Sequence, residues 1–170
     1  TILWFSFRSK RDTGYVLGLT VLGIGATYGT SGALTAIGVP MTFNAAMNSI
    51  PVLLLAIGVD YGLHVVKRVR EEYQVISSST DRSVESVGAM DQTSRRAAIL
   101  RGTKFTSIAL LIAIFTDMVG FLSFRLSSQE FLVVFGTVIA IGLFYIYVLS
   151  ITALPALMAL FPPKDMPIKK

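Results

Sequence analysis

Two acidic side chains, Asp60 and Asp117, lie inside long apolar runs of the sequence, where their chemistry is unusual. A carboxyl near the centre of a membrane-spanning helix costs about 2.5–3.5 kcal/mol on insertion scales, so such a residue usually faces a bundle interior and has a function. Gly58 and Gly62 flank Asp60, and their four-residue spacing lets another helix approach closely. We therefore expect the Asp60 carboxyl in a packed, water-poor seam, where it could gain and lose a proton.

Three further residues could take part in the same chemistry. His64 follows Asp60 by four residues, so a helix carries both on one face, and its imidazole could relay protons. Tyr61 could donate a hydrogen bond across a helix seam. Asp117 lies at a depth that differs from that of Asp60 by about one or two helical turns, so the two could line one path without touching. The alternative roles are an interfacial histidine, a packed aromatic ring and a carboxyl held in a polar seam.

Four apolar runs must position these residues, near 14–37, 44–66, 104–125 and 131–160. A spanning helix needs about 20 mainly apolar residues, and the runs do not alternate as barrel strands do. The chain of 170 residues is 53% hydrophobic and 15% charged, which is too little charge to coat a typical soluble domain. The sequence therefore predicts an all-α membrane protein with a four-helix transmembrane bundle, and it argues against a soluble enzyme.

Composition also limits the cofactors and the packing. The chain has no cysteine and one histidine, so we expect no disulfide, no metal site built on thiolates or several histidines, and no cofactor. The first apolar run is rich in glycine, and Gly25 and Gly29 have the same four-residue spacing as Gly58 and Gly62. We expect all four glycines to serve helix packing.

The basic residues predict the orientation and the segments. Of the 15 Lys and Arg residues, all but Arg125 fall in segments on one side of the four runs, and the positive-inside rule makes that side cytoplasmic. These residues are not interleaved with aromatics, so we expect no nucleic-acid partner. The predicted segments are 1–12, the end of a preceding membrane helix with a basic girdle; 13–66, two spans; 67–103, a cytoplasmic loop; 104–161, two more spans; and 162–170, a cytoplasmic tail.

Within these connections three local structures are expected. Residues 82–103 are compatible with a weakly amphipathic helix on the inner leaflet. The Ser77-Ser78-Ser79-Thr80 stretch is typical of a flexible turn. Ser127 followed three residues later by Glu130 predicts a capping box at the start of the last span.

The stretch Gly58-Val59-Asp60-Tyr61-Gly62-Leu63-His64, followed by the charged cluster 67–72, resembles the fourth-helix motif of the resistance-nodulation-division (RND) superfamily. It is most similar to the MMPL-like exporters of lipids and hydrophobes, and Patched-like proteins and sterol-sensing domains share the architecture. Further segments resemble this family in the same order: 38–42, 95–106, 120–123, 131–142 and 150–157.

The resemblance implies a twelve-helix cell-membrane transporter of two pseudo-repeated halves with large extracytoplasmic domains. This chain would hold the third to sixth helices of one half, and its partners would be membrane lipids, the other half, those domains and a hydrophobic or lipid substrate. By similarity, Asp60 and Tyr61 match the Asp-Tyr pair that carries proton coupling in MMPL-type members. Asp117 departs from the family pattern, which has a small or hydroxyl residue there, and it could be an addition to the relay.

Three functions are therefore compared. The first is export of a hydrophobic or lipid-like substrate driven by the proton-motive force, which the resemblance favours and which involves no enzymatic reaction. The second is a lipid- or sterol-sensing module without transport, in which the acid is structural. The third is an intramembrane aspartyl protease with two carboxyls that activate water, but that family has a Tyr-Asp helix before its Gly-x-Gly-Asp helix, the reverse of the order here.

Overall fold

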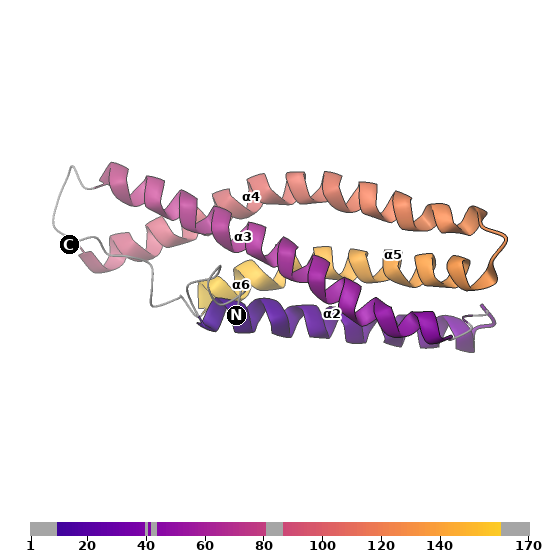
Figure 1. Ribbon diagram of the computed structural model, residues 1–170. Helices are drawn as coiled ribbons and strands as arrows, with labels where there is room; N and C mark the ends of the chain where they lie inside the picture. The colour runs from indigo at the N-terminus through magenta and orange to yellow at the C-terminus, as the bar shows by residue number, and fades with distance from the viewer. Residues whose placement is uncertain (1–9, 40, 42–43, 81–86, 161–170) are drawn as a thin grey trace.

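The computed structural model describes residues 10–39, 41, 44–80 and 87–160, and this part of the chain is built of helices without strands (Figure 1). The helices are α2 (Lys10–Ala36), α3 (Ile50–Thr80), α4 (Val87–Leu122), α5 (Glu130–Ile151) and α6 (Ala153–Leu160), with short 3₁₀ helices η1 (Ala45–Ser49) and η2 (Ser123–Leu126).

Four helical stretches of the described chain are long and apolar enough to cross a membrane. They are Asp12–Ala36, Met47–Ile76, Arg96–Leu126 and Glu130–Leu160. The predicted all-α membrane protein with a four-helix bundle is thus confirmed, and the chain is a multi-pass membrane protein.

In the described chain the long connection between the second and third spans, expected as a loop with an amphipathic helix, is mostly helical. With 31 and 36 residues, α3 and α4 are about 46 and 54 Å long, against a hydrocarbon core of about 30 Å. Their joined ends project beyond α2 and α6 (Figure 1). The expected amphipathic helix and the third span are one continuous helix from residue 87 onward, and residues 82–86 lie outside the described chain.

The extension of α3 and α4 is held by an apolar seam that continues past the predicted runs 44–66 and 104–125. Val69, Ala98 and Ile99 are buried in it. Gly102 packs so tightly that a Cβ there would lie 2.8 Å from the Cα of Val69. Because this packing keeps both helices regular, Ser77–Thr80 forms the last turn of α3, and the prediction of a flexible turn at those residues was wrong.

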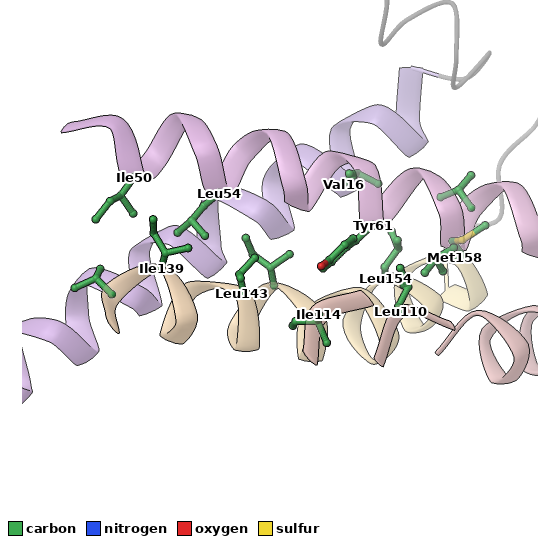
Figure 2. Packing of buried hydrophobic residues seen from close by; sticks show 14 of the residues in the cluster. Val16, Ile50, Leu54, Tyr61, Leu110, Ile114, Ile139, Leu143, Leu154 and Met158 are labelled. Atoms are coloured by element: carbon green, nitrogen blue, oxygen red, sulfur yellow. The ribbon is translucent and has the colours of Figure 1, made fainter. Parts of the chain in front are cut away.

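The core lies where α5 packs against α2, α3 and α4 (Figure 2). Its fully buried side chains include Ile50 and Leu54 of α3 and Ile139 and Leu143 of α5. Lipid tails are as apolar as leucine, so helices in a bilayer associate through close packing rather than through the hydrophobic effect. The core therefore depends on shape, and glycines let the backbones approach.

The two glycines of α3 meet α2 directly. A Cβ at Gly58 would lie 2.6 Å from Cγ2 of Thr20, and one at Gly62 would lie 2.5 Å from Cγ1 of Val16. At Gly25 and Gly29 a Cβ would meet nothing within 4 Å, and both residues are exposed in the described chain. The packing expected at Gly25 and Gly29 is therefore not made by the described residues, because this face of α2 points away from α3 and α5.

Helix α2 is unusually rich in hydroxyl side chains for a membrane span. Five of them donate hydrogen bonds to the carbonyl four residues earlier, at 2.7 to 3.0 Å: Thr20, Thr27, Thr30, Ser31 and Thr35. Polar groups that are satisfied within their own helix can lie in lipid or in a core at little cost. The hydroxyls thus keep α2 compatible with a span.

The turn before α5 differs from the predicted capping box. The hydroxyl of Ser127 accepts a hydrogen bond from the backbone N–H of Gln129 at 3.1 Å. The helix begins at Glu130 with Gln129 at the N-cap, and no side chain caps it. Ser127 therefore closes a short turn two residues ahead of the helix, and the capping-box prediction was wrong.

Candidate functional site

Asp60 points away from the glycines that flank it, contrary to the packed seam expected from the sequence. Successive residues of an α-helix are about 100° apart, so Asp60 lies about 200° around α3 from both Gly58 and Gly62. The glycines face α2, whereas the Asp60 side chain is 62% exposed in the described chain. The seam and the acid are on opposite sides of α3.

The exposed carboxyl lies beside His64, as the four-residue spacing predicts. The Nε2 atom of His64 is 3.7 Å from Oδ1 of Asp60, and both side chains are mostly exposed. Lys67 and Glu71 continue the same face at intervals of three and four residues. The result is a polar stripe on α3 that runs from Asp60 to the end of the bundle where α3 extends, which we call the basic end.

A cleft of about 550 Å³ between α3 and α4 opens along this stripe. On the α3 side it is lined by Asp60, Tyr61, His64, Lys67, Arg68 and Glu71, and on the α4 side by Phe105, Thr106, Ala109, Leu110 and Ala113. One wall is therefore mainly polar and the other mainly apolar. The α4 lining was missed from the sequence, although Phe105, Ala109 and Ala113 share one face at four-residue intervals, which was the available signal.

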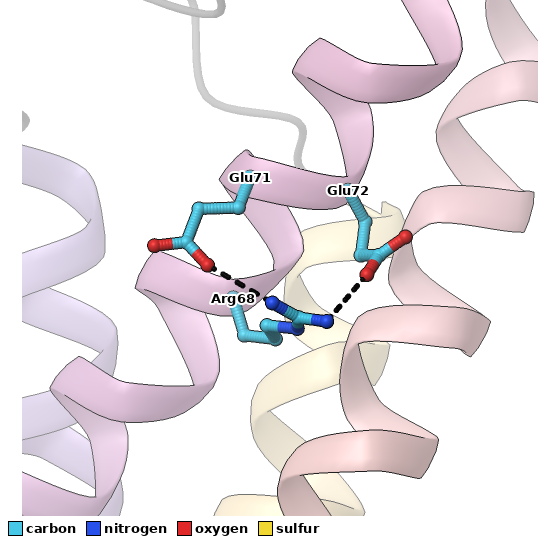
Figure 3. Close-up of polar contacts among 3 residues, drawn as sticks. All are labelled: Arg68, Glu71 and Glu72. Atoms are coloured by element: carbon cyan, nitrogen blue, oxygen red, sulfur yellow. Dashed lines mark hydrogen bonds and ion pairs between the residues drawn. The ribbon is translucent and has the colours of Figure 1, made fainter.

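Arg68 lines the cleft and makes three contacts. Its guanidinium bonds Glu71 at 3.3 Å and Glu72 at 2.9 Å on the same helix (Figure 3). It also lies 5.8 Å from the ring centroid of Phe105 on α4, within the range of a cation–π interaction. The contact with Phe105 joins α3 to α4 at the level where the polar stripe ends.

Tyr61 also lines the cleft, but its side chain is buried in the bundle. Its side chain is 4% exposed and lies among core residues of α3, α4 and α6 (Figure 2). Its hydroxyl donates a hydrogen bond to Oδ2 of Asp117 on α4 at 2.9 Å. The sequence predicted a hydrogen bond from Tyr61 across a helix seam and placed Asp117 about one or two helical turns from the depth of Asp60, but it did not identify Asp117 as the partner of Tyr61.

The four predicted residues thus form two pairs on two sides of α3. Asp60 and His64 face the cleft, and Tyr61 and Asp117 join α3 to α4 inside the bundle. The first pair can exchange protons with water that enters the cleft. The second pair consists of a phenol and a carboxylate, both able to carry a proton, and its Tyr61 is next to Asp60 in the chain.

The hydrogen bond between Tyr61 and Asp117 should couple the two residues energetically. We expect Tyr61→Phe and Asp117→Leu each to destabilise the bundle by about 1–3 kcal/mol, because each leaves a polar partner unsatisfied, half-buried in the case of Asp117 and buried in the case of Tyr61. Their effects should not add in the double variant, and Asp117→Asn should keep much of the stability because its amide oxygen still accepts the bond. Unfolding in mixed detergent would measure this cycle, and additive single effects would contradict the bond.

A further charged pair was missed from the sequence. Asp12, in the first turn of α2, is 1% exposed and pairs with Arg70 of α3 through a short contact between Oδ2 and Nη2. The residues are 58 positions apart, so no sequence spacing signals the pair. Breaking one member of a buried pair leaves an uncompensated charge, so the pair fixes the start of α2 against α3.

The fold and the site together define a multi-pass membrane bundle whose spans carry ionisable groups beside an open cleft. The family model described as "MMPL family" matches residues 1–169, so the chain belongs to the MMPL family. This confirms the resemblance to the MMPL-like branch of the RND superfamily.

Two curated relatives are much longer than this chain. The membrane protein MJ1562 of Methanocaldococcus jannaschii is 29% identical over 141 residues, which cover 83% of this chain and 32% of that protein. The hopanoid transporter HpnN of Rhodopseudomonas palustris is 26% identical over 164 residues, which cover 95% of this chain and 16% of that protein. No solved structure matches significantly.

Proposed function

We propose that the full-length protein is a secondary transporter that uses the proton-motive force to export a hydrophobic or lipid-like substrate, and that Asp60 binds the coupling proton. The observation that carries the proposal is the exposed Asp60 carboxyl, which lies in a cleft within a membrane-length stretch of α3. Family membership supports transport, and the relative HpnN, a hopanoid transporter, supports a hydrophobic substrate.

In this proposal the cleft connects Asp60 to water at the basic end. His64 lies one helical turn from Asp60 toward that end. Its imidazole can therefore take a proton from the Asp60 carboxyl or return one. Lys67 and Glu71 keep the remaining path polar. The basic end would face the cytoplasm, together with both termini and the connection between α3 and α4, because basic residues gather there.

Tyr61 and Asp117 form the second part of the proposed relay. Their hydrogen bond joins α3 to α4, so a change in the charge of Asp117 would alter the packing of the two helices that border the cleft. Asp60, exposed on the outer side of α3, is available to the other half of the transporter. Proton binding at Asp60 could then change the contact between the halves.

Water access to the cleft can be tested with single cysteines, because this chain has none. We expect Ala113→Cys, which lines the cleft, to react with a membrane-impermeant thiol reagent added from the side of the basic end. Ile112→Cys, the neighbouring residue, is 66% exposed outside the cleft and should stay unlabelled in the bilayer. The measurement is adduct formation in the full-length protein with any other cysteines replaced.

Equal labelling at the two positions would mean that the cleft carries no water of its own.

The test of proton coupling itself is gradient-driven transport by the full-length protein with Asp60→Asn. If Ala113→Cys is not labelled although the full-length protein couples transport to proton flux, the proton reaches Asp60 by a route other than the cleft.

A further inference from the structure

Helix α4 carries three exposed cations just before its long apolar stretch. Arg96, Arg101 and Lys104 are all exposed, and the membrane-length segment of α4 begins at Arg96. Between Arg96 and Leu122 the only acid is Asp117, which is bonded to Tyr61 on the side of α4 that faces α3. From Arg96 to Leu122, the exposed charged residues of this helix are therefore all cations.

The two arginines of α3 at the same end are used differently. Arg68 is paired with Glu71 and Glu72, and Arg70 is paired with Asp12. Within the described residues, no ion pair involves Arg96, Arg101 or Lys104. The α3 arginines are therefore paired with carboxylates, whereas the α4 cations are exposed.

The same face of α4 continues into the membrane as an apolar stripe. With about 100° per residue, Arg96, Leu100, Lys104, Ile108 and Ile112 follow one another at four-residue intervals, and Arg101 lies beside Lys104 and Ile108. Leu100 is 72% exposed, and Ile108 and Ile112 are also exposed. The cations and the stripe are thus continuous, with the charge at the level where the apolar residues begin.

We propose that this face, Arg96, Leu100, Arg101, Lys104, Ile108 and Ile112, is a binding surface for an anionic phospholipid, which we call the α4 lipid surface. The anionic headgroup lies among the three cations, and the acyl chains lie along the apolar stripe. Charge complementarity selects the anionic headgroup, and the continuous stripe selects a lipid over a soluble anion. Each Lys or Arg near a membrane surface contributes about 1 kcal/mol of attraction to anionic lipid.

The proposal goes beyond transport, because it requires only that the protein lies in a bilayer. A soluble phosphate would use the cations but gain nothing from Leu100, Ile108 and Ile112. An acidic protein segment would bind the cations and leave these apolar residues in lipid, so the two lipid probes would label the surface equally. These alternatives are outcomes of the test.

The test is photo-crosslinking of the full-length protein in phosphatidylcholine vesicles with two probes, a photoreactive phosphatidylglycerol and a photoreactive phosphatidylcholine. Mass spectrometry of α4 peptides gives the ratio of the two adducts at the α4 lipid surface. We expect the anionic probe to be favoured by about fivefold or more, and less so in high salt. In the variant with Arg96→Gln, Arg101→Gln and Lys104→Gln the ratio should fall toward one.

Two controls keep the test decisive. Arg125→Gln removes the exposed cation at the opposite end of the bundle and should leave the ratio at α4 unchanged, and Arg101→Lys with Lys104→Arg should retain the preference because charge is conserved. If the triple variant does not fold, the salt dependence of the wild-type ratio decides. Equal labelling by both probes, a ratio unchanged in the triple variant, or loss of the preference on adding glycerol phosphate would each overturn the proposal.

Discussion

Replacing Asp60 by asparagine should abolish gradient-driven transport by the full-length protein. The amide has nearly the shape of the carboxyl but cannot take up a proton and release it again, so a conformational cycle that depends on this step stops. Because the side chain is 62% exposed in this chain, the substitution breaks no buried contact of the described bundle. The measurement is proton flux and efflux of a hydrophobic substrate in vesicles with an imposed pH gradient.

The matched control is Glu130→Gln, the same change at an exposed acid at the start of α5. It should transport as the unchanged protein does, because Glu130 lies outside the cleft and the two pairs of the site. Normal gradient-driven flux in Asp60→Asn would refute the coupling role of Asp60. If the substrate lipid still bound to Asp60→Asn, and neither this variant nor the unchanged protein showed flux, the lipid-sensing function would be favoured instead.

The spans could be predicted from the sequence because their signal is local. An apolar run of sufficient length predicts a helix in a bilayer whatever surrounds it, and the predicted run 131–160 matches the span Glu130–Leu160 closely. The extension of α3 and α4 could not be predicted in this way. It depends on contacts between segments far apart in the sequence, such as Gly102 against Val69, which leave no periodic apolar run of membrane length.

The candidate acids could be predicted from the sequence, but their surroundings could not. Asp60 and Asp117 are conspicuous because charge is scarce in the spans. The expectation that glycines bury Asp60 treated neighbours in the sequence as neighbours in space. Residues two positions apart on a helix point to nearly opposite sides. The bond from Tyr61 to Asp117 requires the relative rotation of α3 and α4, which is set by the whole core.

The same limit explains the outcome for the glycines of α2. The four-residue spacing of Gly25 and Gly29 predicts that a helix can approach there, but it does not say which helix does so. Within the described chain α3 uses its own glycines, Gly58 and Gly62, to approach α2. The open glycine face of α2 therefore remains available to a part of the protein outside the described residues.

The glycine whose replacement should cost most stability is Gly136 of α5. A Cβ there would lie 2.2 Å from the carbonyl oxygen of Phe121 and 3.0 Å from Cβ of Phe124. The first of these atoms belongs to the backbone and cannot turn aside, so α5 must move away from the end of α4. We expect Gly136→Ala to destabilise the bundle by about 1–3 kcal/mol, the usual cost of overpacking, measured by unfolding in mixed detergent.

Gly120, near the same end of α4, provides the matched comparison. It is exposed, and a Cβ there would meet nothing within 4 Å. Gly120→Ala should therefore leave stability unchanged or raise it by up to about 1 kcal/mol through helix propensity. Equal effects of the two substitutions would show that backbone propensity, rather than the approach of Phe121 to α5, determines the cost. A selective loss at Gly136 would instead show that this close approach fixes the distance between α4 and α5, and with it the position of Asp117 opposite Tyr61.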